Sequence, residues 1–166
     1  MSQLRVKPEA ESYLNTYEKL KEAIAGLTDE DLTWKASPQQ WSITEVLAHL
    51  VDHSVIVSFR IREILSGSDV QLPIFSQDAW VAGQKANEGT AADAMQLFKA
   101  LLDYHSALFQ RLSADDWSKS GVNWKGEVIS LAAVIHAFIS HVETHLAQID
   151  RIKLKNNEVR NSSCPI

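Results

Sequence analysis

The sequence predicts an all-α protein that forms a four-helix bundle in one domain. Apolar residues recur at helical spacing in four long segments, and no segment shows the strict alternation expected of a β-strand. Helix-start and helix-stop residues flank these four segments. A chain of 166 residues with 45% hydrophobic residues can bury a substantial core without disulfide bonds. One compact helical domain is therefore the expected architecture.

The first two helices are expected over residues 8–26 and 42–67. Pro8 suits the first turn of the first helix, because that turn does not need its backbone N–H. The second helix begins with a capping box, in which Ser42 caps the helix and Glu45 stands at the third helical position. The apolar positions of this second helix are Val46, Leu47, Leu50, Val57, Ile61 and Ile64.

The third and fourth helices are expected over residues 90–112 and 129–153. Thr90 and Asp93 have the spacing of a second capping box at the start of the third helix. The fourth helix is recognised by its apolar positions, which are Val134, Ile135, Phe138, Val142, Leu146 and Ile149.

The remaining segments are a long connection and a polar tail. The connection spans residues 68–89 and shows no long helix, and we expect it to fold over one end of the bundle as a lid. Residues 1–153 are expected to form a single domain. Residues 154–166 are polar and are expected to be disordered.

The charge and the cysteine content indicate which partners the protein can bind and which cellular compartment it occupies. The net charge is −5, and the basic residues are scattered among acidic ones, which argues against nucleic acid as a partner. No apolar run approaches membrane-spanning length, and the first residues lack the apolar core of a signal peptide, so no membrane association is expected. The single cysteine, Cys164, favours a reducing compartment, which we take to be the cytoplasm.

Two histidine pairs have the spacing that places both imidazoles on one face of a helix, one turn apart. His141 and His145 form one pair in the fourth helix, and His49 and His53 form the other in the second. Each pair has chelating geometry and lies beside apolar core positions. His105 also falls on an apolar stripe, where a hydrogen-bonded core histidine is the simpler interpretation.

Spacing excludes two classes of metal enzyme. A zincin needs Glu directly after the first His of the pair, whereas Val142 follows His141 here, and Glu143 lies about 200° around the helix from His141. Ferritin-like di-iron bundles need Glu three residues before His, and no Glu in this chain has that position. The pattern therefore favours a mononuclear site made by His141, His145 and one histidine of the second helix, with positions open for water or substrate.

Such a site predicts nucleophilic chemistry. An ion with neutral imidazole ligands keeps its full charge, so it lowers the pKa of a bound water or thiol. His53 would then act as a base or orient the substrate. Asp52 and Glu45 are candidate hydrogen-bond partners for the second nitrogen of His49, although the capping box already explains Glu45. Of the five tryptophans we place Trp80 near a pocket and the others at the ends of the bundle.

Two motifs resemble the DinB superfamily of DinB/YfiT-like metalloenzymes. The segment 41–50 reads Trp-Ser-Ile-Thr-Glu-Val-Leu-Ala-His-Leu, which is similar to the start of the second helix in that family. His141 and His145 match the His-x-x-x-His of its last helix. A looser similarity over residues 72–80 resembles the branch that includes thiol transferases. Together these segments span most of the chain in the same order.

The resemblance implies a bundle, often a homodimer, that binds one divalent metal ion, commonly nickel or zinc. It implies that His49, His141 and His145 are the ligands. Spacing alone leaves the choice between His49 and His53 open. Activities in the superfamily include metal-assisted transfer of low-molecular-weight thiols such as bacillithiol, and a mycothiol-dependent isomerisation. The expected function is thus thiol transfer to an electrophilic small molecule, or metal-dependent hydrolysis. The alternative is a non-catalytic metal-binding bundle with a stress-related or interaction role.

Overall fold

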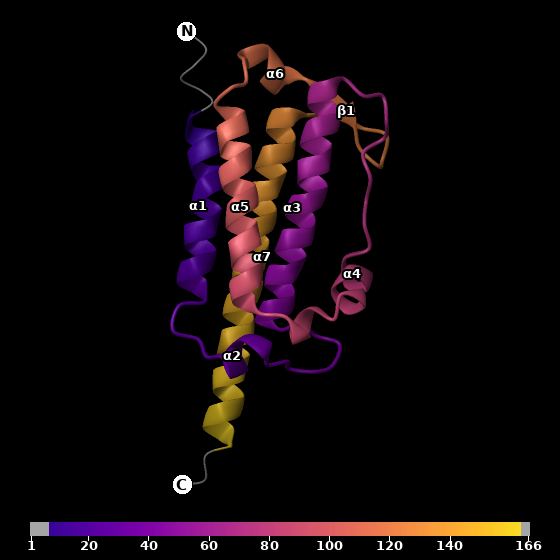
Figure 1. The fold of residues 1–166 in the computed structure, drawn as a ribbon. Helices are drawn as coiled ribbons and strands as arrows, with labels where there is room; N and C mark the ends of the chain where they lie inside the picture. Colours follow the sequence, from indigo (N-terminus) through magenta and orange to yellow (C-terminus); the bar gives the residue numbers. More distant parts are fainter. Residues whose placement is uncertain (1–6, 164–166) are drawn as a thin grey trace.

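The computed structural model describes residues 7–163 and confirms the four-helix bundle (Figure 1). Its four long helices are α1 (Lys7–Ala23), α3 (Ile43–Ser66), α5 (Ala91–Phe109) and α7 (Leu131–Ser162). Helices α1 and α3 each pack against both α5 and α7. The predicted second and fourth helices, α3 and α7, are therefore neighbours along the bundle, as a shared histidine site requires.

Short elements lie in the connections between the long helices. They are α2 (Asp29–Thr33), α4 (Gln77–Gly83), the 3₁₀ helix η1 (Ala86–Glu88), α6 (Ala114–Ser118), and the strands β1 (Ser120–Val122) and β2 (Val128–Ser130). The two strands pair antiparallel, with Gly121 opposite Ile129. This hairpin was not predicted, because three residues are too few for an alternating pattern to be recognised.

The predicted cap at the start of α3 is present. The Ser42 hydroxyl accepts a hydrogen bond from the Glu45 backbone N–H, and the Glu45 carboxylate accepts one from the Ser42 N–H. At the start of α5, Thr90 accepts from the Asp93 N–H. These local bonds fix where both helices begin, and so they fix the register of the residues that follow.

The prediction of a disordered tail over residues 154–166 is wrong for the part that the structure describes. Helix α7 continues to Ser162 and extends beyond the other long helices (Figure 1). Asn156 Nδ2 donates to Asp31 Oδ1 at 3.1 Å, and Arg160 Nη1 lies 2.7 Å from the same carboxylate oxygen. Contacts with α2, far away in sequence, thus stabilise this extension. Cys164 lies outside the described residues.

We expected the connection over residues 68–89 to cover one end of the bundle, and this expectation is wrong. The connection runs along the side of α3 and includes α4 (Figure 1). Its anchor is Leu72, which is buried in the core and whose N–H donates to Val122 O at 2.7 Å. The connection therefore lies beside the helix that carries His49 and His53.

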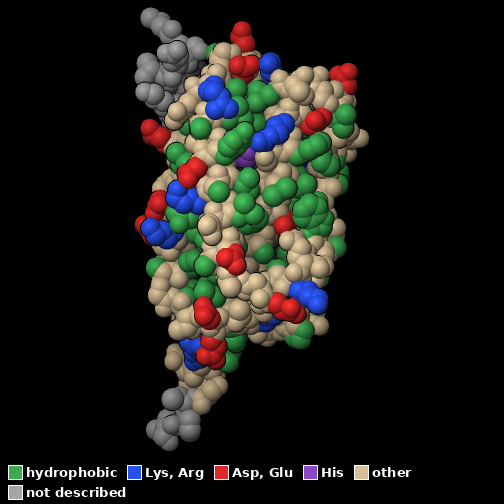
Figure 2. Space-filling model, viewed as in Figure 1, with side chains coloured by type: hydrophobic (Ala, Val, Ile, Leu, Met, Phe, Trp, Pro, Cys, Tyr) green, Lys and Arg blue, Asp and Glu red, His purple; other side chains and the backbone are tan. Residues whose placement is uncertain are grey.

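The core is apolar and the visible surface is mixed in charge. Aromatic side chains fill the middle of the bundle, among them Tyr13, Phe98, Phe109 and Phe138. On the face in Figure 2, acidic and basic groups alternate with hydrophobic side chains. Among the described residues, none of the helices has both the length and the apolar character that crossing a lipid bilayer requires.

Candidate metal centre

Three histidines from α3 and α7 meet at the contact between these helices. The Nε2 atoms of His49 and His141 lie 2.9 Å apart. One nitrogen from each of His49, His141 and His145 can be chosen so that all three lie within 4.8 Å of one another. The structure thus brings together the three residues that were predicted as metal ligands.

The three imidazoles are neutral at neutral pH. Burial is the main cause that lowers the pKa of His49 to about 3, and the charges of His145 and His141 lower it further. Burial and the charge of His145 likewise lower the pKa of His141 to about 4. The pKa of His145 is lowered as well, mainly by burial. Neutral rings offer lone pairs, which is the form in which histidine binds metals.

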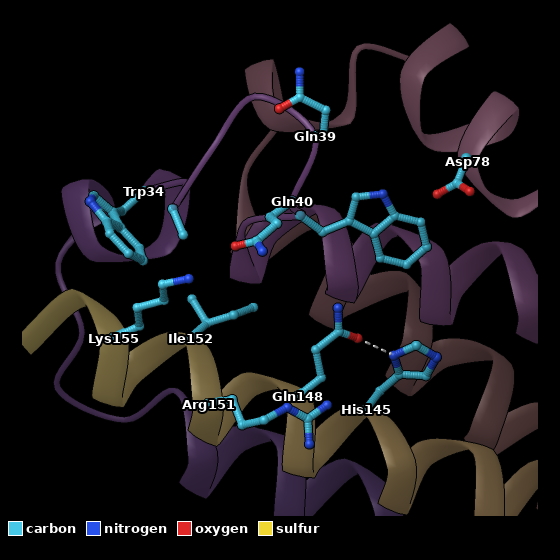
Figure 3. Close-up of a pocket in the computed structure, with 11 residues that line it drawn as sticks. Trp34, Gln39, Gln40, Asp78, His145, Gln148, Arg151, Ile152 and Lys155 are labelled. Carbon is cyan, nitrogen blue, oxygen red and sulfur yellow. Dashed lines mark hydrogen bonds between the residues drawn. The ribbon is translucent and has the colours of Figure 1, made fainter.

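Gln148 fixes the orientation of the His145 ring. Its Oε1 lies 2.7 Å from His145 Nδ1 (Figure 3). Because an amide oxygen only accepts, Nδ1 carries the proton and the lone pair is on Nε2. Gln148 was not predicted as a site residue. Its position three residues after His145, on the same helix face, is the signal that could have identified it.

This donor set fits a divalent metal ion. Zinc–nitrogen bonds are about 2.0–2.1 Å long, so two nitrogens on one ion are at most about 4.2 Å apart. The His49 and His141 nitrogens, at 2.9 Å, are within this limit, and the 4.8 Å within which all three nitrogens lie exceeds it by less than an ångström. No hydrogen bond to another protein group engages these two Nε2 atoms among the described residues. One of the two rings can donate to the other in the metal-free protein, and a bound ion would replace that hydrogen bond.

The partners predicted for the second nitrogen of His49 have other contacts. Asp52 accepts a hydrogen bond from Gln84 Nε2 at 2.9 Å. Glu45 serves the capping box and pairs with Lys35 at 2.8 Å. Neither carboxylate contacts His49 Nδ1, which is buried and has no hydrogen-bond partner among residues 7–163. Both carboxylates share a helix face with His49, but Ser42 and Lys35 engage Glu45, and Gln84 engages Asp52.

His53 lies beside the cluster of three histidines rather than within it. Its ring stacks on His141, with centroids 3.9 Å apart, and on Phe138 at 5.7 Å. Burial, followed by the charges of neighbouring histidines, lowers its pKa to about 2. His53 also lines a cavity of about 150 Å³, together with Arg60. It therefore contacts both the cluster and this small cavity.

Aromatic side chains surround the cluster. The Trp41 and His49 ring centroids are 5.0 Å apart, and those of Phe75 and His49 are 6.0 Å apart. Trp34 and Trp41 line a cavity of about 580 Å³ that opens beside His145. The sequence did not predict that these two tryptophans line a cavity. Trp80 packs on Phe75, with centroids 4.8 Å apart, and lines another cavity of about 500 Å³, so its placement near a pocket is confirmed.

His105 is a hydrogen-bonded core histidine, as the sequence indicated. It is fully buried, and its Nδ1 lies 2.9 Å from the Tyr13 hydroxyl. Its Nε2 lies 3.0 Å from the Ser58 hydroxyl. Both ring nitrogens therefore have protein partners, and His105 takes no part in the cluster.

Known proteins share both the sequence pattern and the fold. A family model described as the DinB superfamily matches residues 13–149. The Oceanobacillus iheyensis protein named "Putative metal-dependent hydrolase OB0413" is 26% identical over 147 residues, covering 89% of this chain and 82% of the relative. "Putative metal-dependent hydrolase YfiT" of Bacillus subtilis is 23% identical over 136 residues, covering 81% of this chain and 76% of the relative.

Two solved structures have a similar fold. The structure of YfiT from Bacillus subtilis, described as having an unusual four-helix bundle topology, has a TM-score of 0.83 at 18% identity and covers 95% of this chain and 90% of that chain. A mycothiol-dependent maleylpyruvate isomerase has a TM-score of 0.70 at 9% identity, covering 87% of this chain and 60% of that chain. At these identities the likeness concerns the fold.

Proposed function

Since this chain belongs to the DinB superfamily, we propose that it is a metal-dependent enzyme that acts on a small molecule. One observation carries the proposal: three neutral imidazoles meet where a cavity of about 580 Å³ opens beside His145. A structural metal site is closed by a full set of protein ligands, whereas a catalytic site keeps a position open. The ligands in this proposal are His49, His141 and His145, and nickel or zinc is the ion that we assign to them.

The reaction that we assign is transfer of a low-molecular-weight thiol to an electrophilic small molecule. A divalent ion bound here supplies a Lewis acid, which lowers the pKa of a thiol or water that it binds. The isomerase with a similar fold depends on a thiol, mycothiol, which supports this assignment. Hydrolysis is the second candidate, because both curated relatives carry the name of metal-dependent hydrolases.

Residues around the ligands have distinct roles in this proposal. Gln148 keeps the proton of His145 on Nδ1, and the ring of Trp41 limits the access of water to His49. We assign to His53 the orientation of His141 through their stacked rings. A pKa of about 2 makes the His53 imidazole a weak base, which favours this role over proton abstraction at neutral pH.

Metal stoichiometry tests the ligand set. Protein purified without a polyhistidine tag, loaded with zinc or nickel and desalted, should contain about one ion per chain. The His49→Ala variant should contain none while its circular dichroism spectrum is unchanged. His136→Ala is the matched control, because His136 is exposed and pairs with Glu9 away from the cluster. Equal loss of metal from both variants would contradict the assignment.

Turnover then separates the enzyme from a non-catalytic bundle. The metal-loaded protein should accelerate the reaction of a small thiol with a chromogenic aryl halide, and chelation or His49→Ala should abolish that rate. Hydrolysis of nitrophenyl esters tests the second candidate in the same way. If the ion binds and raises the melting temperature but supports neither reaction, the non-catalytic bundle is the better description.

A further inference from the structure

The cavity beside His145 carries an excess of positive charge. Figure 3 shows Gln148, Arg151 and Lys155 projecting from α7 on the cavity side, with Trp34 and Gln40 across from them. Arg151 and Lys155 are the cationic residues of the lining, and Asp78 is its acidic residue. A volume of about 580 Å³ is suited to a ligand of drug size.

Neither cation is neutralised within the protein. Among residues 7–163, Arg151 and Lys155 form no ion pair and no hydrogen bond that would occupy their charged groups. In contrast, Lys153 on the same helix donates to Ala23 O, and Arg160 pairs with Asp31. Like charges four residues apart also repel each other slightly. Two uncompensated cations on one wall of a cavity are what an anionic ligand would complement.

The cations lie at a defined distance from the histidine cluster. At about 1.5 Å per residue, Arg151 is roughly 9 Å and Lys155 roughly 15 Å along α7 from His145. Arg151 is near enough for its charge to lower the pKa of His145. Between the cations and the histidine cluster, the cavity wall includes the ring of Trp41 and the amide of Gln148. The ring centroids of Trp41 and His145 are 6.4 Å apart.

We propose that this cavity binds a small molecule that bears a carboxylate, with Arg151 and Lys155 holding the carboxylate and the reacting group placed at the histidine cluster. The inference rests on the proposed function, because it names the substrate class of that site. The ligand is elongated, with its charge roughly 9–15 Å from the reacting atom. Its apolar middle lies along Trp34 and Trp41, which is where burial of carbon surface contributes to binding.

The test compares two thiols of equal length that differ only in charge at the far end. Binding of 8-mercaptooctanoate and 8-mercapto-1-octanol to the zinc-loaded protein is measured by calorimetry. The wild type should bind the acid about tenfold or more tightly than the alcohol, since charge-assisted hydrogen bonds are stronger than neutral ones. The variant Arg151→Gln/Lys155→Gln should lose that preference and still bind the alcohol.

A matched control removes the same charge elsewhere. Arg111 follows α5 and, among residues 7–163, its side chain bonds only to the Ala107 carbonyl, and Lys125 lies in the turn between β1 and β2. Neither residue lines the cavity. Arg111→Gln/Lys125→Gln should keep the preference for the acid. Loss of preference in this control as well would overturn the proposal, because it would show an effect of net charge alone. Equal affinity of the wild type for both thiols would also overturn it, and would leave the proposed metal site intact.

A second measurement separates this inference from the proposed function. Octanoate and 1-octanol are titrated into metal-free protein, with tryptophan fluorescence as the readout. If the wild type binds octanoate and Arg151→Gln/Lys155→Gln does not, the carboxylate site is supported. This holds even if the zinc-loaded protein binds neither thiol, and that failure to bind thiols would count against the open metal position alone. If the zinc-loaded protein binds neither thiol, the absence of charge-dependent binding of octanoate overturns the inference.

Discussion

His105 and His49 are both fully buried on inward faces of the bundle, but their ring nitrogens meet different partners. Both nitrogens of His105 lie within hydrogen-bonding distance of hydroxyl groups, those of Tyr13 and Ser58. His49 faces another imidazole through Nε2, and its Nδ1 has no partner among residues 7–163. One environment satisfies its histidine, and the other leaves it dependent on a further group.

The comparison shows that burial and a low pKa do not identify a metal site. Burial lowers the pKa of His105 to about 4, the same value as for His141. What distinguishes the cluster is the convergence of three imidazoles, in which the Nε2 atoms of His49 and His141 have, among residues 7–163, only each other as hydrogen-bond partner. His105 and the cluster histidines are all neutral at neutral pH. The partners of their ring nitrogens show whether a histidine stabilises the core or can bind a metal ion.

The largest expected effect is on metal affinity. His141→Ala should lower zinc affinity by more than about 100-fold, because one of three imidazole ligands is lost. Competition with a chromophoric chelator measures this change. His105→Phe should bind zinc as the wild type does. Loss of zinc in the folded His105→Phe variant would erase the distinction between the two environments.

The second effect is a pH dependence that belongs to His105. The pKa of His105 is lowered from 6.5 to about 4, mainly by burial, so on acidification the unfolded chain binds a proton before the folded one does. Its contribution to the free energy of unfolding is therefore complete above about pH 6.5 and falls by roughly 3 kcal/mol as the pH drops to about 4.

Denaturant titrations of the metal-free wild type and of His105→Phe measure this effect across that pH range. The cluster histidines titrate in the same direction in both proteins, so the difference between the two pH profiles isolates His105. Parallel profiles would show that His105 does not carry this dependence.

The third effect contrasts stability without metal. His105→Phe should lower the free energy of unfolding by about 2 kcal/mol, because the buried Tyr13 hydroxyl loses its partner. His49→Phe should lower the free energy of unfolding of the metal-free protein by less, about 1 kcal/mol, because His141 Nε2 loses its partner while the unpartnered His49 Nδ1 is removed from the core. Urea denaturation measures both, and equal losses would contradict the contrast.

The smallest expected effect comes from Gln148. Gln148→Ala should lower zinc affinity by about tenfold, because His145 Nδ1 loses the acceptor that fixes its tautomer. Gln148→Glu keeps an acceptor at that place and should keep or raise the affinity. If both substitutions weaken binding equally in the chelator competition, the role of Gln148 is packing rather than orientation.

The helices of the bundle could be predicted from local signals. Ser42 caps α3 through bonds that span three residues, and Gly67 ends it with φ 73°, in the left-handed region that favours glycine. The spacing of His141 and His145 likewise fixes their common face, and their ring centroids are 4.5 Å apart. Each of these features depends on neighbours within one helical turn, so each is encoded locally.

Other features depend on contacts across the fold and were not predictable in this way. The extension of α7 to Ser162 depends on Asp31, which is more than 100 residues away along the chain and bonds to Asn156 and Arg160. The path of residues 68–89 depends on Leu72 reaching the core beside β1. A polar segment carries no local mark of such partners, which is why the tail was expected to be disordered.

By itself the sequence determined the four helices, the two histidine pairs and the core character of His105. Spacing left His49 and His53 as alternatives and the resemblance implied His49, while the tertiary structure shows that His49 meets His141 and His145 and that His53 stacks beside them. The two α3 histidines share a helix face, and the packing of α7 against α3 selects one of them. Spacing within a helix fixes which side chains can act together, and the contact between helices decides which of them do.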